Sequence, residues 1–319
     1  MEKQREINSM GIVYIIMLLG NIIISTVALA LHRFGINVPS IIASVLCEIV
    51  VLLPTIIYLK SKGENIPEKL GFHKIKTSTV FLTILLTLAA LPIASFANAL
   101  SQLFVKNIVV QSSGEMIEGS VAMTLIVVSV LAPICEEIAF RGFLFNGIKG
   151  ISSVIKAVFI SSLLFGLLHL NLNQFCYAVV LGVIFALVNQ ASGSTWTSVI
   201  MHFVYNMINI VVLIIATLSM REQNIDYAQA QEAARQSGAL SMIMVYGALS
   251  VVCVFLVWLL LKTIARNQGN LESFKNILAR KNIQDAESDV RVHSFLNAPM
   301  MLSTFIGIVA MIVYQVSGV

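Results

Sequence analysis

The stretch ICEEIAFRGFLF, residues 134–145, places two adjacent glutamates and an arginine within an otherwise apolar sequence. On both sides the chain consists mainly of Leu, Ile, Val, Ala, Phe and Ser. A charged side chain at the centre of a membrane helix costs roughly 3 kcal/mol or more unless it finds a partner. Glu136, Glu137 and Arg141 therefore need partners inside the fold or a chemical function.

The composition is that of a membrane protein. Of the 319 residues, 58% are hydrophobic and only 11% are charged, whereas a soluble domain has about 25% charged residues. No basic stripe with interleaved aromatic residues is present, which argues against a nucleic-acid partner. The four cysteines lie far apart in apolar segments, so we expect no disulfide framework.

Nine apolar runs are long enough, or nearly so, to cross a bilayer. Backbone groups in lipid must be hydrogen-bonded within the chain, so these runs are expected to be helices. The sequence thus predicts an all-α, polytopic transmembrane helical bundle of about eight to nine helices. The first run follows basic residues, as in a signal peptide, but its length indicates a retained helix. The runs cover residues 11–31, 39–59, 77–101, 120–140, 151–170, 175–190, 195–219, 239–261 and 297–316.

The distribution of lysine and arginine predicts the orientation of the chain. With the N-terminus in the cytoplasm, sixteen of the twenty basic residues fall on the cytoplasmic side, which the positive-inside rule favours. We therefore expect a multi-pass protein of the cell membrane with a cytoplasmic N-terminus. The long polar segment 262–293 is then a cytoplasmic loop, in which LESFKNILARK forms either a helix on the membrane surface or a solvated linker. The four remaining basic residues are Arg33, Lys106, Arg221 and Arg235.

Helical spacing separates the roles of the two glutamates. Glu137 and Arg141 are four residues apart, so they share a helix face and can form an ion pair. Glu136 points about 100° away from Glu137 and cannot share that pair well. Glu136 therefore needs a different partner.

His169 is a candidate for that partner. The midpoint between Glu136 and His169 falls in the turn-like stretch NGIKGISS, so two antiparallel helices joined there would bring both side chains to the same depth. Hydropathy, however, places His169 next to the predicted outer loop NLNQ and Glu136 in the inner half of its helix. Either the turn at residues 150–153 extends beyond the membrane, or NLNQ dips inward.

A third polar cluster lies in MHFVYNMIN. His202, Asn206 and Asn209 fall on one face of an apolar helix. Histidine and asparagine can both donate hydrogen bonds to a developing oxyanion. Together with a glutamate that takes a proton from water and a histidine beside it, they form a hydrolytic set of residues.

Each cluster also has a purely structural interpretation. The Glu137–Arg141 pair can simply fix helix geometry, and His169 can bond a backbone carbonyl. His202 and Asn206 can join neighbouring helices. Intramembrane ionisable groups are functional-site candidates by default, and the occurrence of all three clusters within about seventy residues favours a site.

The sequences EEIAFRG, FGLLH and HFVYN resemble, in order, the EExxxR, FxxxH and HxxxN motifs of the CPBP family. This family contains the CAAX prenyl endopeptidase type 2 (Rce1-like), Abi-type and bacteriocin-processing intramembrane proteases, which are common in bacteria. The resemblance covers about residues 120–210 and implies a cavity-containing catalytic core. It divides the chain into N-terminal helices (1–119), a CPBP/Abi core (120–219) and C-terminal helices with a cytoplasmic polar loop (220–319).

The resemblance also implies roles for individual residues. Glu136 would activate the attacking water with help from His169, as in a glutamate protease. His202 and Asn206 would hold the oxyanion, and Glu137 with Arg141 would shape the site. The family analogy favours a cavity open to the cytoplasmic side.

A metal-dependent mechanism is an alternative, because Glu136, His169 and His202 could supply three zinc ligands. HExxH is absent, and no carboxylate that would orient the histidines is evident in the sequence. We therefore expect no metal and no cofactor. A cysteine protease based on Cys135 and His169 is disfavoured, because Cys135 and Glu136 are adjacent and cannot face the same point equally.

The sequence therefore predicts an intramembrane endopeptidase that hydrolyses a membrane-embedded or lipidated peptide, with the lipid bilayer as its environment. The main alternative is a non-catalytic membrane scaffold on the same fold, such as an immunity protein or a regulator of a sensor. A transporter with a Glu–His proton relay would be expected to show paired halves with broken helices, and these are not evident.

Overall fold

The computed structural model describes residues 2–105, 108–223, 227–277 and 298–317. These residues are mainly helical and contain no strand, which confirms the predicted all-α class. The elements, in chain order, are α1 (Glu2–Arg33), α2 (Ser40–Ser61), α3 (Ile66–Lys69), α4 (Thr77–Ser101), α5 (Ile108–Gly119), α6 (Val121–Thr124), η1 (Leu125–Leu131), α7 (Ala132–Glu137), η2 (Ile138–Phe145), α8 (Asn146–Ile151), α9 (Val154–Leu168), α10 (Leu172–Ser192), α11 (Thr195–Glu222), α12 (Tyr227–Gln268), α13 (Leu271–Lys275) and α14 (Ala298–Ser317).

Within the described residues, eight helical spans are long and apolar enough to cross a membrane, which confirms a polytopic bundle of the predicted size. The predicted run 151–170 differs from the others. It forms α9, which has 15 residues and is therefore about 22 Å long, shorter than a hydrocarbon core of about 30 Å. The eight spans are Lys3–Arg33, Ser40–Ser61, Thr77–Ser101, Val121–Ile151, Leu172–Ser192, Thr195–Glu222, Leu240–Gln268 and Ala298–Val316.

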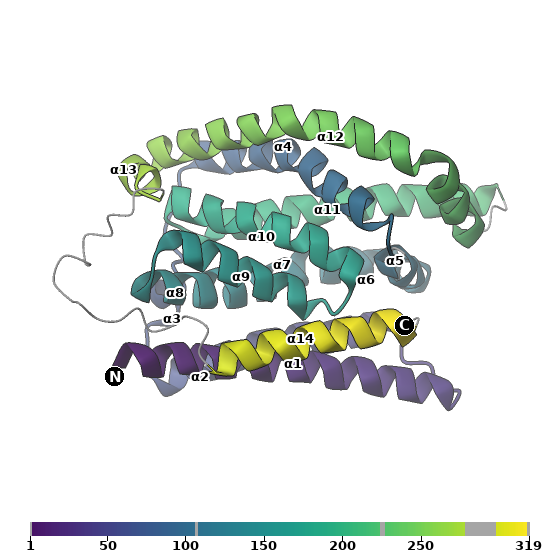
Figure 1. Cartoon of the computed structure of the whole chain (residues 1–319), viewed down its shortest axis with the longest axis horizontal. Coiled ribbons are helices and arrows are strands. Elements are labelled where there is room, and N and C mark those ends of the chain that lie inside the picture. The colour runs from purple at the N-terminus through teal and green to yellow at the C-terminus, as the bar shows by residue number, and fades with distance from the viewer. Residues whose placement is uncertain (1, 106–107, 224–226, 278–297, 318–319) are drawn as a thin grey trace.

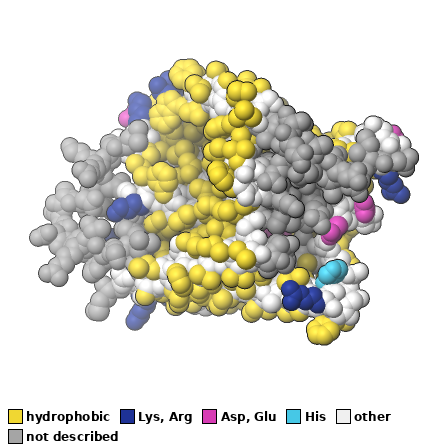
Figure 2. Space-filling model, turned by 45° about the vertical axis from the view of Figure 1, so that its right-hand side comes forward, with side chains coloured by type: hydrophobic (Ala, Val, Ile, Leu, Met, Phe, Trp, Pro, Cys, Tyr) yellow, Lys and Arg dark blue, Asp and Glu magenta, His cyan; other side chains and the backbone are white. Residues whose placement is uncertain are grey.

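The helices form two outer groups around a central one (Figure 1). α1, α2 and α14 lie along one side, and α4 packs along α12 on the other. The segment from α6 to α8, together with α9, α10 and α11, lies between them. Hydrophobic side chains cover a broad area of the face in Figure 2, and charged side chains gather toward its ends, as expected for a bundle surrounded by lipid.

The central span Val121–Ile151 is not a regular α-helix. Two π-helical segments, η1 and η2, flank the short α7 that contains both glutamates. Pro133 near the start of α7 has no amide hydrogen, so the backbone before it cannot close every regular α-helical bond. π-helical turns are rare and frequently occur at functional sites, so this local geometry singles out α7.

The connection between α9 and α10 is partly buried in the bundle. Leu170 is buried and adopts a left-handed conformation with φ of 54°, which is strained for a residue with a side chain. The buried Asn173 donates hydrogen bonds to Asn98 Oδ1 (2.9 Å) and Ser101 Oγ (2.7 Å). Non-helical backbone at membrane depth requires such cover. This burial supports the second of the two alternatives for NLNQ, in which the loop dips inward and holds His169 inside the bundle.

In the C-terminal part, one helix is longer than the sequence-based expectation. α12 extends over Tyr227–Gln268, well beyond the predicted run 239–261. In LESFKNILARK, helix α13 ends at Lys275, and Phe274 is buried against Trp258 (ring centroids 5.4 Å apart). Phe274 therefore packs into the bundle, while Glu272, Ser273 and Lys275 are exposed. Whether this segment lies on the membrane surface or is a solvated linker stays a prediction. The rest of the predicted polar loop, residues 278–297, lies outside the described residues.

Candidate active site

Glu137 and Arg141 form a completely buried ion pair. Arg141 Nη1 lies 2.9 Å from Glu137 Oε1, and both side chains are 0% exposed. The guanidinium also lies over the rings of Phe165 and Phe185, 4.4 and 5.1 Å from their centroids, where the π faces attract a cation. Arg141, counted above with the cytoplasmic basic residues, is therefore a core residue, and the spacing argument for its pair with Glu137 is confirmed.

The space around Arg141 leaves no room for an added methyl group at Gly182 on α10. A Cβ atom there would lie 3.0 Å from Arg141 Nη2 and 2.9 Å from Ser162 Cβ. Gly182→Ala should therefore lower the free energy of unfolding by about 1–3 kcal/mol, because overpacking a tight core forces shifts of this cost. Thermal unfolding of the detergent-purified protein measures this. Gly150→Ala is the matched control, since nothing lies within 4 Å of its added Cβ; equal stability of the two variants would contradict the prediction.

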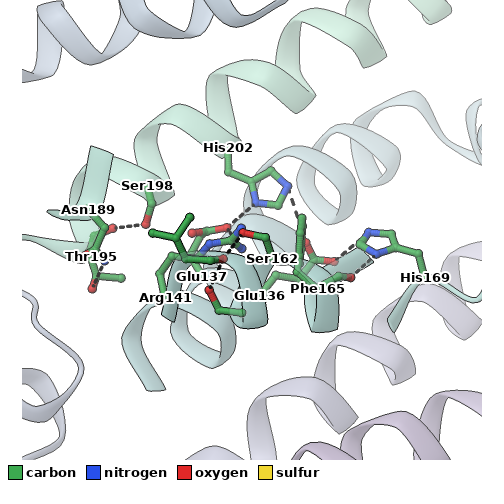
Figure 3. Close-up of polar contacts among 12 residues, drawn as sticks. Glu136, Glu137, Arg141, Ser162, Phe165, His169, Asn189, Thr195, Ser198 and His202 are labelled. Atoms are coloured by element: carbon green, nitrogen blue, oxygen red, sulfur yellow. Dashed lines mark hydrogen bonds and ion pairs between the residues drawn. The ribbon is translucent and has the colours of Figure 1, made fainter. Parts of the chain in front are cut away.

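Glu136 lies between the two histidines (Figure 3). Glu136 Oε1 is 3.9 Å from His169 Nε2, and Oε2 is 3.6 Å from His202 Nε2. Glu136 comes from α7, His169 from the end of α9 and His202 from α11. The predicted same-depth placement of Glu136 and His169 is therefore confirmed, and His202 joins them from a third element.

The Nδ1 atoms of both histidine rings have hydrogen-bond partners that fix the tautomers. His169 Nδ1 lies 2.9 Å from the carbonyl oxygen of Phe165, which can only accept, so Nδ1 carries the hydrogen. His202 Nδ1 lies 3.1 Å from Glu137 Oε1, a carboxylate oxygen already paired with Arg141. In the neutral rings both Nε2 atoms are therefore acceptors, and both face the Glu136 carboxylate.

The contact between Glu137 and His202 corrects one argument made from the sequence. A carboxylate that orients a histidine was expected to be absent, yet Glu137 does this for His202, and such a partner is typical of histidines that bind metals. Its presence removes the sequence argument against a metal. Within the described residues, no group of three or more His, Cys, Asp or Glu side chains has a geometry that would hold a metal ion.

The asparagines lie farther along α11. Asn206 donates one hydrogen bond from Nδ2 to the carbonyl oxygen of Val128 in η1, at 2.9 Å. An asparagine amide has a second N–H, so Asn206 retains one donor. Asn209 donates to the carbonyl oxygen of Tyr205 on its own helix (2.8 Å) and is exposed.

A cavity of about 880 Å³ joins these residues. It reaches from Glu136, His169 and His202 toward the end of the bundle where α1 connects to α2, as the lining residues Val38 and Ser40 indicate. Asn206 and Asn209 also line it. Among the other polar side chains in the wall, which the sequence reasoning did not single out, are Glu48 on α2, Tyr177 on α10 and Tyr205 on α11. Glu48 could have been found, because it is a carboxylate inside a predicted membrane span.

Comparison with known proteins identifies the segment that carries this site. The family of type II CAAX prenyl endopeptidases, Rce1-like, matches residues 118–208. The protein named "Putative membrane peptidase YdiL" of Bacillus subtilis (strain 168) is 30% identical over 87 residues, 27% of this chain and 36% of that protein. An uncharacterized protein of Mycoplasma capricolum is 38% identical over 105 residues, 30% of this chain and 29% of that protein. The matched region thus spans about a third of the length of each relative.

No solved structure matches the chain. The family match starts just before α6 and ends in α11, and it encloses Glu136, Glu137, Arg141, His169, His202 and Asn206. It agrees with the resemblance inferred from the three motifs. The chain is thus a multi-pass membrane protein whose residues 118–208 form an Rce1-like segment, similar to type II CAAX prenyl endopeptidases.

Proposed function

We propose that this protein is an intramembrane endopeptidase of the CPBP type, which hydrolyses a peptide bond with a water molecule activated by Glu136. The observation that carries the proposal is the position of the Glu136 carboxylate between His169 and His202 at the wall of a cavity. The neighbouring Glu137 is neutralised by Arg141, so the two glutamates have different surroundings. The Rce1-like match supports membrane protease activity in general.

The tautomers of the histidines support a binding position for the attacking water next to the Glu136 carboxylate. A carboxylate oxygen and a neutral Nε2 cannot hydrogen-bond to each other, because both accept. At 3.9 Å, Glu136 Oε1 and His169 Nε2 are suited instead to share a water that donates one hydrogen to each. Glu136 then takes a proton from this water while its oxygen attacks the carbonyl carbon. The same proton passes to the amine nitrogen as the C–N bond breaks, which leaves a carboxylic acid and an amine.

The developing oxyanion needs donors that are free to point at it. Asn206 can supply its second N–H. His202 can donate from Nε2 only in its protonated form, because Nδ1–H is directed at Glu137. The negative charge of Glu137 favours that protonated ring. In this proposal Glu137 is a positioning residue that acts through His202, with Arg141 holding Glu137 in place.

The proposed substrate is a membrane-embedded or lipidated peptide. The cavity lies inside the helical bundle, and its wall mixes apolar side chains with carboxamides such as Asn21, Asn98 and Gln174. Apolar groups suit a substrate that leaves the bilayer, whereas amides can bond an extended peptide backbone. A soluble globular protein would have to unfold locally before a peptide bond reached Glu136.

The test compares peptide termini in host cells that contain either the wild type or Glu136→Gln at matched membrane abundance. Termini that are lost only in the variant would establish proteolysis and give the cleavage sequence. Identical sets of termini, together with a phenotype that both forms restore equally, would instead support the non-catalytic scaffold.

The orientation in the cell membrane can be predicted from the cavity and the charge distribution together. The cavity extends toward the α1–α2 connection, which is the end of the bundle opposite the N-terminus. A cytoplasmic N-terminus and a cavity open to the cytoplasm therefore cannot both hold. We propose the former, because fifteen of the nineteen basic residues other than the buried Arg141 then fall on the cytoplasmic side, as the positive-inside rule favours. The substrate would then enter from the outer side.

A labelling experiment distinguishes the two orientations. Phe34→Cys lies in the α1–α2 connection and Lys62→Cys lies beyond the other end of α2; both positions are exposed. In a variant without the four native cysteines, a membrane-impermeant maleimide should label Phe34→Cys in intact cells and Lys62→Cys only after permeabilisation. The reverse pattern would place the cavity on the cytoplasmic side, as the family analogy suggests.

A further inference from the structure

Glu48 is a buried carboxylate that the proposed reaction leaves without a role. It lies on α2, where the buried residues Glu48, Val51, Thr55 and Leu59 share one helix face. α2 packs against α7 and η2, so this face is directed toward the helix that contains Glu136. Glu48 is only 9% exposed, yet it lines the cavity that reaches Glu136, His169 and His202.

The carboxylate of Glu48 has no counter-charge within the part of the chain that the structure describes. Its Oε2 atom is buried without a hydrogen-bond partner. Arg141, the buried cation of the neighbouring span, is paired with Glu137 and does not line the cavity. Burying a carboxylate without a counter-charge costs free energy. We therefore expect a ligand that supplies the counter-charge.

Glu48 and Glu136 are the two acidic residues among the described residues that line the cavity, and no described lysine or arginine lines it. At the end near the α1–α2 connection, Ser40 lines the cavity and donates a hydrogen bond to Glu115 Oε2 at 2.8 Å. A cleft with one sign of charge in low-dielectric walls attracts and concentrates ligands of the opposite sign.

We propose that Glu48 binds a cationic nitrogen of the substrate, on a Lys or Arg side chain or a free amino terminus near the scissile bond. This inference deepens the proposed function and rests on it for the identity of the ligand as a substrate. The bound cation would supply the counter-charge that Glu48 lacks within the described residues, and it would hold the substrate in the cavity that also contains Glu136.

Binding to the full-length Glu136→Gln protein in lipid nanodiscs tests the proposal without requiring turnover. The probes are fluorescent apolar peptides in which lysine, arginine or norleucine is moved one position at a time, each with a free or an acetylated amino terminus. At one position lysine or arginine should bind at least about tenfold more tightly than norleucine, because the ion pair forms away from bulk water. If the amino terminus is the source of the cation, acetylation should remove the preference instead.

The second variant is Glu48→Gln in the same Glu136→Gln background. Glutamine keeps the shape of Glu48 and removes a charge that is costly to bury, so folding should not suffer. The affinity of the cationic peptide relative to the norleucine peptide should then fall close to one. Thr55→Val is the matched control, because Thr55 lies on the same face of α2, two turns away, and does not line the cavity; it should keep the preference.

The outcomes separate this inference from the proposed function. If no peptide shows a preference for a cation, or if the preference survives Glu48→Gln, the role of Glu48 is wrong even where the wild type cleaves peptides. If the preference depends on Glu48 but the wild type produces no more cleavage than Glu136→Gln, the cation site stands and the proposed peptidase activity is wrong.

Discussion

Replacing Glu136 with glutamine should lower the rate of peptide hydrolysis by about 10²–10⁴-fold, the usual contribution of a general base. Glutamine has nearly the same shape, but its amide cannot take a proton from water. The variant should nevertheless fold, because Glu136 does not take part in the buried Glu137–Arg141 pair. The measurement is kcat on a peptide identified from cellular termini, made alongside thermal unfolding of the same preparation.

Two controls make this result specific. Cys135→Ala changes the adjacent buried thiol and should keep activity, whereas a cysteine nucleophile would make this variant inactive. Treatment of the wild type with a metal chelator tests for a metal-dependent mechanism, because Glu137 orients His202 as carboxylates orient metal-binding histidines. Activity should persist in the chelator if Glu136 acts on water alone. Full activity in Glu136→Gln would show that the base has been assigned to the wrong residue.

The sequence predicted the parts of this site that depend on helix geometry. A spacing of four residues pairs Glu137 with Arg141, because side chains at i and i+4 share a face. Glu136 and His169 are the same number of residues away from the turn in NGIKGISS, and they lie at one depth. Two antiparallel helices joined by a turn advance by similar amounts per residue. The Glu137–Arg141 pair forms although Arg141 lies in the π-helical segment η2.

Contacts between elements that are distant in the sequence could not be predicted in this way. The contact of Glu137 with His202 joins residues 65 positions apart, and it depends on how α11 rotates against α7. Glu48 belongs to α2, outside the matched segment 118–208, so the motifs do not point to it. A rule that treats every intramembrane carboxylate as a functional candidate would have found Glu48, but the packing of α2 was needed to place it in the cavity.

Arg141→Ala should have the largest effect on stability, a loss of about 3–5 kcal/mol, which is typical when one partner of a buried ion pair is removed. The substitution leaves the carboxylate of Glu137 in a fully buried position without its cation. It also removes the guanidinium from the rings of Phe165 and Phe185. The amount of folded protein in the membrane and the unfolding temperature in detergent both measure this loss. Lys149→Ala, at a half-buried position near the end of the same span, is the control and should lose much less.

The double variant Glu137→Gln with Arg141→Met separates the cost of an unpaired charge from the cost of lost packing. Methionine fills part of the space between the rings, and glutamine keeps an oxygen that can accept from His202 Nδ1. Because no charge is then left unpaired, much of the stability lost in Arg141→Ala should return. Activity should stay low, since a neutral partner no longer favours the protonated form of His202 that the proposed oxyanion site requires. Recovery of both stability and activity would mean that the pair only holds the fold together.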